Sequence, residues 1–147
     1  MSRTVASMLD QKGHEVKTTT GDVKALDAIK SMTEAGVGTL VVVNKSGRLS
    51  GILSERDFFR KMILQGKDPA QVPVKSIMTR KLIVVSKDKS VEECLTLMTN
   101  NRIRHLPVVD EEENLTGIVS IGDCVKFLLS EKDLMIQNLE KYIEGSI

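Results

Sequence analysis

The sequence predicts an α/β (α+β) fold made of two similar units, each a small sheet with two helices. The first observation is a repeat: a shift of 66 residues aligns 25–57 with 91–123 without a gap, and ten of these 33 aligned positions are identical. The second is the order of patterns, since in each copy helical spacing is followed by two short β-branched runs and then by helical spacing again. The third is size, because 147 residues, 41% of them hydrophobic, suffice for two small units that share a core.

An extended segment precedes the first helix of each copy, at residues 18–20 and 82–86. Asp22 opens the first of these helices, and Ser90 with Glu93 forms a capping box at the start of the second. Gly36 and the pair at 100–101 are typical of helix ends. Two strands joined by a turn then follow, at 40–43 and 49–54 in the first copy and at 106–109 and 115–120 in the second.

The second helix of each copy is expected at 55–65, before Gly66, and from Gly122 to about residue 129. Proline and glycine then break both periodicities and mark a linker. The predicted organisation is unit one at 1–68, the linker at 69–73, unit two at 74–130 and a C-terminal helix at 131–147.

Composition excludes several classes of function. The net charge of +1 provides no field for steering nucleic acid or an anionic membrane, and an aromatic content of 3% provides few stacking platforms. No segment is typical of a membrane span or a signal peptide, which predicts a cytoplasmic protein. Cys94 and Cys124 are expected to be core thiols.

A G-x-x-S-x-x-D motif stands at both strand-to-helix junctions, at residues 51–57 and 117–123. With V-K-S-I-M-T at 74–79 and R-I-R-H-L-P-V-V at 102–109, it makes the chain resemble a tandem pair of CBS domains over about residues 3–130. The resemblance implies a stand-alone regulatory module whose two units pack sheet to sheet about a pseudo-twofold axis. It also implies two clefts for an adenosine-containing ligand, with AMP, ADP, ATP and NAD as candidates.

The motif's chemistry is consistent with that role. Ser54 and Ser120 stand at helix N-termini, where free N–H groups favour a phosphate. Asp57 and Asp123 follow three residues later, where a carboxylate can accept hydrogen bonds from both hydroxyls of a ribose. The alternative is that these acids only favour the helix dipole.

The two copies differ around the motif. The first has Arg56 inside it and the small residues Gly38 and Thr39 before its strand, whereas the second has Arg104 and His105 before its strand. The resemblance implies that this loop helps to hold phosphates, so Arg104 and His105 are expected in the second site and Arg56 in the first or at the shared centre. The alternative for His105 is an ordinary strand histidine.

Adenine would need apolar walls and polar groups at its edge. Wall candidates are Met78, Val85, Ile103 and Pro107 for the second site, and Leu9, Val16 and Val37 for the first. Simple core packing is the alternative for each of them. Backbone groups beside Thr20 and Ser86 are the candidates for reading the base edge.

Catalysis is not expected, because His14 and His105 are the only histidines and no nucleophile with a base is recognisable. Neither histidine is spaced with cysteines or acids as a metal site requires. The module is therefore expected to act on a separate, unknown regulated protein. The alternative function is a nucleotide-independent protein-interaction scaffold, and nucleic-acid binding is a third, disfavoured one.

A homodimer is also expected. Residues 131–144 form an amphipathic helix candidate whose apolar face needs a partner surface. Phe58, Phe59, Met62 and Ile63 are further interface candidates, with intramolecular core as their alternative.

Overall fold

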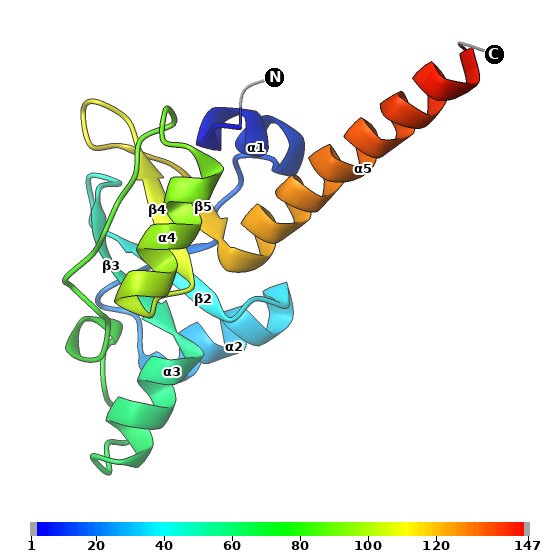
Figure 1. Cartoon of the computed structure of the whole chain (residues 1–147). Coiled ribbons are helices and arrows are strands. Elements are labelled where there is room, and N and C mark those ends of the chain that lie inside the picture. The colour runs from blue at the N-terminus through cyan, green and yellow to red at the C-terminus, as the bar shows by residue number, and fades with distance from the viewer. Residues whose placement is uncertain (1–2, 146–147) are drawn as a thin grey trace.

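The computed structural model describes residues 3–145 and has the predicted α+β architecture, with two small sheets in the middle of the body (Figure 1). The first copy contains α1 (Val5–Lys12), β1 (Thr18–Thr20), α2 (Ala25–Ala35), β2 (Thr39–Val43), β3 (Leu49–Ser54), α3 (Glu55–Asp57) and the π-helical stretch η1 (Phe58–Ile63). The second contains the 3-10 turn η2 (Val74–Ser76), α4 (Val91–Asn101), β4 (His105–Val109), β5 (Leu115–Ser120) and α5 (Ile121–Gly145). Residues 1–2 and 146–147 of the predicted ranges lie outside the described part.

The two sheets are built alike around a hairpin. In the first, β1 runs parallel to β2 and β2 runs antiparallel to β3. In the second, β4 and β5 form the antiparallel hairpin, and the segment before α4 adds only one parallel bridge, from Val85 to Val108. Both hairpins carry the same register shift one residue before the end of their first strand.

An approximate twofold axis relates the two copies. Thr39 Oγ1 lies 3.3 Å from Nδ1 of His105, and Arg48 forms an isolated antiparallel bridge with Asn114. Both pairs are separated by 66 residues, the shift of the sequence repeat. Residues that meet their own equivalents lie at a twofold axis, so this axis passes between the two hairpins.

The segment that begins each copy, α1 in the first and residues 74–78 in the second, packs into the hydrophobic core of the other copy; these two are called the entry segments. Val5, Met8 and Leu9 of α1 pack into the core of the second copy, while Val74 and Met78 pack into the core of the first. Backbone hydrogen bonds fasten both exchanges: Val5 N donates to Lys89 O and Val74 N to Val23 O, each over 2.8 Å. Each core is therefore completed by the other half of the sequence, and the unit boundaries drawn near residues 68 and 74 remain a prediction.

The first helices end close to the expected residues, but only α4 begins with its expected cap. Asp22, expected to open α2, lies in the preceding turn and pairs with Lys75 over 3.0 Å, whereas α2 begins at Ala25 after Lys24. Ser90 caps α4, its Oγ accepting from Glu93 N over 3.0 Å, and α2 ends at Gly36 in the left-handed conformation, with φ of 67°. The helix expected at 55–65 differs, because regular α-helix covers only α3 and continues as η1. There, Phe58 and Met62 are core residues whereas Phe59 and Ile63 are exposed.

The last helix is continuous across the predicted boundary at residue 130. The first turns of α5 lie on the body, where Phe127 and the thiol of Cys124 are buried, and its remainder projects into solvent (Figure 1). Cys94 is buried as well, and burial raises the pKa of the two thiols to about 11 for Cys94 and about 12 for Cys124, so both are core thiols as predicted. Over residues 3–145, no helix has the length and apolar character needed to cross a membrane.

Candidate functional site

The two G-x-x-S-x-x-D junctions fold in the same way. The strand ends at the serine, the helix starts at the next residue, and the aspartate side chain turns back to the backbone of the serine. Asp57 Oδ2 accepts from Ser54 N over 2.8 Å, and Asp123 Oδ2 accepts from Ser120 N over 3.0 Å. Each aspartate therefore satisfies a backbone donor at its own helix N-terminus.

The first junction is closed. Asp57 is 7% exposed, and its Oδ1 accepts from Thr79 Oγ1 over 3.2 Å and lies 3.3 Å from the ammonium of Lys61. Lys61 also donates to the carbonyl of Ile77 over 2.8 Å. Since the chain itself occupies both carboxylate oxygens, Asp57 serves the local structure here.

The second junction is open on one side. Lys12, the last residue of α1, places its Nζ 2.5 Å from Asp123 Oδ2 and 2.6 Å from the carbonyl oxygen of Ile118. Partial burial alone would raise the pKa of the Asp123 carboxyl, but hydrogen bonds from Lys12 and Ser120 and the charge of Lys12 outweigh it and hold the pKa below its usual value. Asp123 is thus ionised at neutral pH.

A cleft of about 370 Å³ opens at this second junction. It is lined by Lys12, Gly13, Glu15, Val16, Lys17, Val37, Gly38, Thr39, His105, Ile118, Ser120 and Asp123. Its volume lies within the range of small-molecule sites. The carboxylate of Asp123 and the hydroxyl of Ser120 stand in it together with three apolar side chains, which suits a ligand with one polar and one apolar part.

His105 lies between the cleft and the twofold axis. Its Nδ1 is 3.3 Å from Thr39 Oγ1, and desolvation by burial lowers the pKa of its imidazole. The ring is therefore neutral at neutral pH and can offer one donor and one acceptor. Arg104, the residue before it, is exposed, and its carbonyl accepts from the first backbone N–H of α5 over 3.0 Å.

The structure brings together Gly38, Thr39, His105, Ser120 and Asp123 from the predicted site residues. It places Ser54, Arg56 and Asp57 at the other junction, with Arg56 exposed. Thr20 and Ser86 are exposed and do not line the cleft. Gly38 and Thr39 lie at the first motif as expected, because Gly38 O accepts from Glu55 N over 3.0 Å and Thr39 pairs with Ser54. They also line the cleft at the second motif, since the twofold axis passes between positions 39 and 105.

The predicted grouping of the apolar walls is wrong. Val16 and Val37, expected beside the first motif, line the cleft of the second. Leu9 and Met78 were expected in the first and second sites, yet Leu9 packs against Gly117 and Met78 against Gly51, because the entry segments are exchanged. Val85 is a core residue, Ile103 packs against the core and Pro107 is buried, and none of the three lines the cleft.

Lys12 is a site residue that no motif in the sequence identifies. It is the last residue of α1, which ends at Gly13, whose φ is 105°. The available signal was the alignment of the α1 sequence with 74–78 at a shift of 69, which places both segments before a copy. That signal does not reveal which junction each segment covers.

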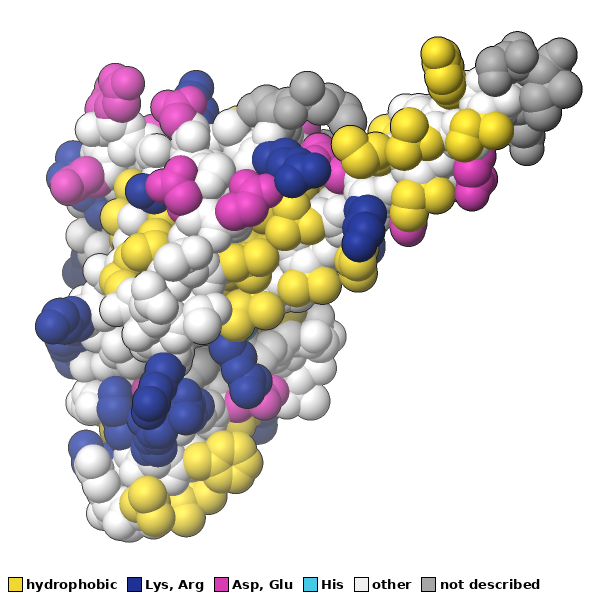
Figure 2. Space-filling model, in the orientation of Figure 1, with side chains coloured by type: hydrophobic (Ala, Val, Ile, Leu, Met, Phe, Trp, Pro, Cys, Tyr) yellow, Lys and Arg dark blue, Asp and Glu magenta, His cyan; other side chains and the backbone are white. Residues whose placement is uncertain are grey.

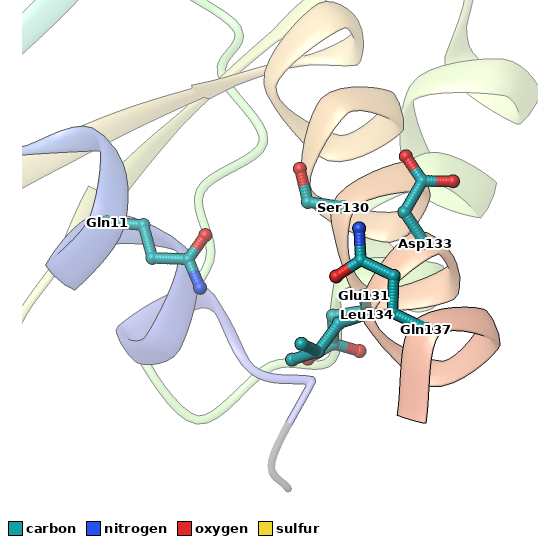
Figure 3. A pocket seen from close by; sticks show the side chains of 6 residues that line it. All are labelled: Gln11, Ser130, Glu131, Asp133, Leu134 and Gln137. Atoms are coloured by element: carbon teal, nitrogen blue, oxygen red, sulfur yellow. The ribbon is translucent and has the colours of Figure 1, made fainter. Parts of the chain in front are cut away.

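A second cavity of about 380 Å³ lies between α1 and α5. Gln11 extends from α1 toward α5, whose side chains Ser130, Glu131, Asp133, Leu134 and Gln137 form the other wall (Figure 3). None of the predicted site residues lies there.

Comparison with known proteins is consistent across sequence and structure. A family model described as CBS domain matches residues 12–64 and 74–130. The chain is 40% identical over 152 residues to the CBS domain-containing protein CBSX3, mitochondrial, of Arabidopsis thaliana, which covers 98% of this chain and 73% of that protein.

Two solved structures share the fold. The CBS domain protein NE2398 superposes with a TM-score of 0.82 at 40% identity, over 88% of this chain and 99% of that one. The CBS domain pair of protein MJ0100, solved in complex with 5′-methylthioadenosine and S-adenosyl-L-methionine, gives a TM-score of 0.75 at 25% identity, over 85% of this chain and 98% of that one.

Proposed function

This chain belongs to the CBS domain family, and from that premise we propose that it is a regulatory module that binds an adenosine-containing ligand in the cleft at Asp123. The candidate ligands are AMP, ADP, ATP and NAD, which share an adenosine and differ around their phosphates. The bound ligand favours one packing of the two units, and a separate regulated protein reads that packing. The module is predicted to be cytoplasmic and to have no catalytic activity of its own.

One observation carries the proposal: an ionised carboxylate and apolar side chains share one small cleft. Asp123 can accept hydrogen bonds from both hydroxyls of a ribose. Val16, Val37 and Ile118 supply apolar surface against which an adenine can pack. This combination matches a nucleoside, which is polar at its sugar and flat and largely apolar at its base.

Lys12 gives the site a built-in competitor. Its ammonium pairs with Asp123 Oδ2, so a ribose that binds this carboxylate shares or displaces the contact. Once displaced, the ammonium lies in the same cleft and can pair with a ligand phosphate. Lys12 therefore favours phosphorylated ligands over the bare nucleoside.

Phosphates would lie toward the N-terminus of α5. The positive end of the helix dipole favours an anion there, and the Ser120 hydroxyl, which accepts from Asp123 N over 3.0 Å, can donate its own proton to a phosphate oxygen. Arg104 precedes β4 beside this terminus, and its planar fork suits two phosphate oxygens. His105 is neutral and contributes a hydrogen bond rather than a charge.

The carboxylate at the first junction is less accessible to a ligand. Asp57 is buried and bonded to Ser54, Thr79 and Lys61, so a ribose would have to break several contacts to reach it. We therefore assign the first and tighter binding event to the second junction.

The test is thermal unfolding of the ligand-free chain with AMP, ADP, ATP, NAD, NADH and S-adenosylmethionine. A ligand at a hundredfold excess over its Kd stabilises the native state by about 2.7 kcal/mol. We expect at least one compound to raise the transition, Asp123→Ala to abolish that rise, and Asp88→Ala, at an exposed position, to retain it.

Two outcomes would overturn the proposal. One is that no compound shifts the transition of protein freed of copurified ligand. The other is a shift that survives Asp123→Ala. In either case, the nucleotide-independent scaffold becomes the function to pursue, and tight binding of one partner protein without nucleotide would support it.

A further inference from the structure

The solvent side of α5 carries an apolar stripe that one lysine interrupts. Val125, Leu129, Ile136, Leu139 and Ile143 are each between 43% and 61% exposed, a high value for side chains of this kind. Successive members are four, seven, three and four residues apart. That is the spacing of a coiled-coil seam. Figure 2 shows hydrophobic side chains along the projecting helix.

The stripe points away from the body. At 100° per residue, its members fall within about 80° of helix circumference. Cys124 and Phe127, which anchor α5 in the core, lie on the other side of the helix. From Val125 to Ile143 the stripe is about 27 Å long at 1.5 Å per residue. A second helix can therefore lie along the whole stripe without displacing any core contact.

We infer that α5 pairs antiparallel with α5 of a second copy of this chain through this stripe. A seam with heptad spacing is complementary to itself, so a second copy supplies the matching surface. This goes beyond the proposed function, because it needs no ligand.

The charges beside the stripe set the direction. Lys126 and Glu140 flank it on the same side and lie two heptads apart. An antiparallel pair brings Lys126 of each copy beside Glu140 of the other, giving two cross pairs of opposite charge. Asp133, midway in the same row, lies opposite Asp133 of the second copy, and the repulsion between these carboxylates offsets part of the attraction of the two cross pairs.

Lys132 excludes the parallel arrangement. It occupies one position within the stripe itself. In a parallel pair in register, it would face Lys132 of the second copy inside an apolar seam. In the antiparallel pair centred near residue 134, it lies opposite Ile136, and its ammonium can extend to solvent.

The first experiment is sedimentation equilibrium of the full chain without nucleotide. We expect a dimer, and we expect Ile136→Asp to weaken it by about tenfold or more because a charge enters the centre of the seam. Asn138→Asp is the matched control: it adds the same charge two residues away on the opposite side of the exposed helix and should leave the dimer intact. Unfolding curves of both variants verify that the body is folded.

Mild oxidation of cysteine variants tests the direction. The native thiols are buried, so they do not interfere. We expect a cross-link when Leu129→Cys and Leu139→Cys chains are mixed and none when Leu129→Cys is oxidised alone. A monomer at all concentrations, a dimer unaffected by Ile136→Asp, or self-linking of Leu129→Cys would overturn the inference.

Discussion

The same motif has different surroundings in the two halves of this molecule. Ser54 and Asp57 form a closed junction whose carboxylate is bonded on both oxygens and buried. Ser120 and Asp123 form the same junction at the wall of a cleft. The serine and the aspartate are the same in both junctions. The segment that packs over each junction, residues 78–79 over the first and α1 over the second, therefore decides whether a ligand can reach it.

The lysines that pair with the two aspartates come from different parts of the chain. Asp57 is held by Lys61, which lies one turn later on its own helical stretch, and by Thr79. Asp123 is held by Lys12, which comes from α1 in the other half of the sequence. A contact within one helix is fixed once that helix forms, whereas a contact between two elements can open without unfolding either. The open junction is thus the one whose cation comes from a separate element.

The largest effect is expected at the motif glycines. In Gly51→Ala the new Cβ would lie 2.8 Å from Met78 Sδ and 2.9 Å from the backbone oxygen of Thr79, which cannot move away alone. In Gly117→Ala it would meet only the end of the Leu9 side chain, at 2.8 Å. We expect Gly51→Ala to lose about 3 kcal/mol and Gly117→Ala about 1 kcal/mol of unfolding free energy, measured with urea. Equal losses would contradict the difference between the covering segments.

The aspartates should separate stability from binding. Asp57→Asn removes a charge from a buried set of hydrogen bonds and should cost about 2 kcal/mol of stability. Asp123→Asn removes a more exposed ion pair and should cost less than about 1 kcal/mol. Ligand titration should show the reverse order, with Asp123→Asn the more damaging variant. The same order in both measurements would show that the two junctions have the same role.

Replacing the two lysines should change ligand affinity at the second junction only. Lys12→Met frees the Asp123 carboxylate, so adenosine should bind about fivefold more tightly, equivalent to ~1 kcal/mol. ATP should gain less or bind more weakly, because a phosphate loses its cation. Lys61→Met, at the closed junction, is the control and should change neither affinity. Calorimetric titration of both ligands measures the difference, and parallel changes for adenosine and ATP would contradict competition.

The smallest effect is a pH dependence of stability near neutral pH that His105, in the second half, carries. Burial lowers the pKa of His105 below its ordinary value of 6.5, so the unfolded chain binds this proton more readily and stability falls as pH drops through 6.5. Thr39 stands at the equivalent position and does not titrate. In His105→Gln, the free energy of unfolding measured with urea should change less between about pH 5 and 7 than in the unchanged chain. A slope unchanged by His105→Gln would assign the pH dependence elsewhere.

The fold was predictable because its signals are local. Strand boundaries 49–54 and 115–120 agree with the sequence pattern, and Ser90 and Gly36 act at the helix ends as expected. The π-helical geometry of η1 has no such signal, since residues 55–65 show only helical spacing.

The motif residues of the site could be predicted from the sequence, but their neighbours could not. Asp123, Ser120 and His105 follow from the motif and the repeat, but the identity of their neighbours depends on the twofold axis and on the exchange of α1 with 74–78. These are long-range contacts, and a sequence repeat does not state which copy covers which junction. For that reason, Val16 and Val37 were assigned to the opposite cleft and Lys12 was not identified.

One rigid element joins the cleft to the projecting stripe. Asp123 stands in the first turn of α5, and the stripe begins two residues later on the same helix. If the ligand changes how α5 sits on α1, the free energies of ligand binding and self-association are linked, and linkage is reciprocal. The apparent ligand affinity then varies with protein concentration, so the module would respond to its own abundance as well as to its ligand.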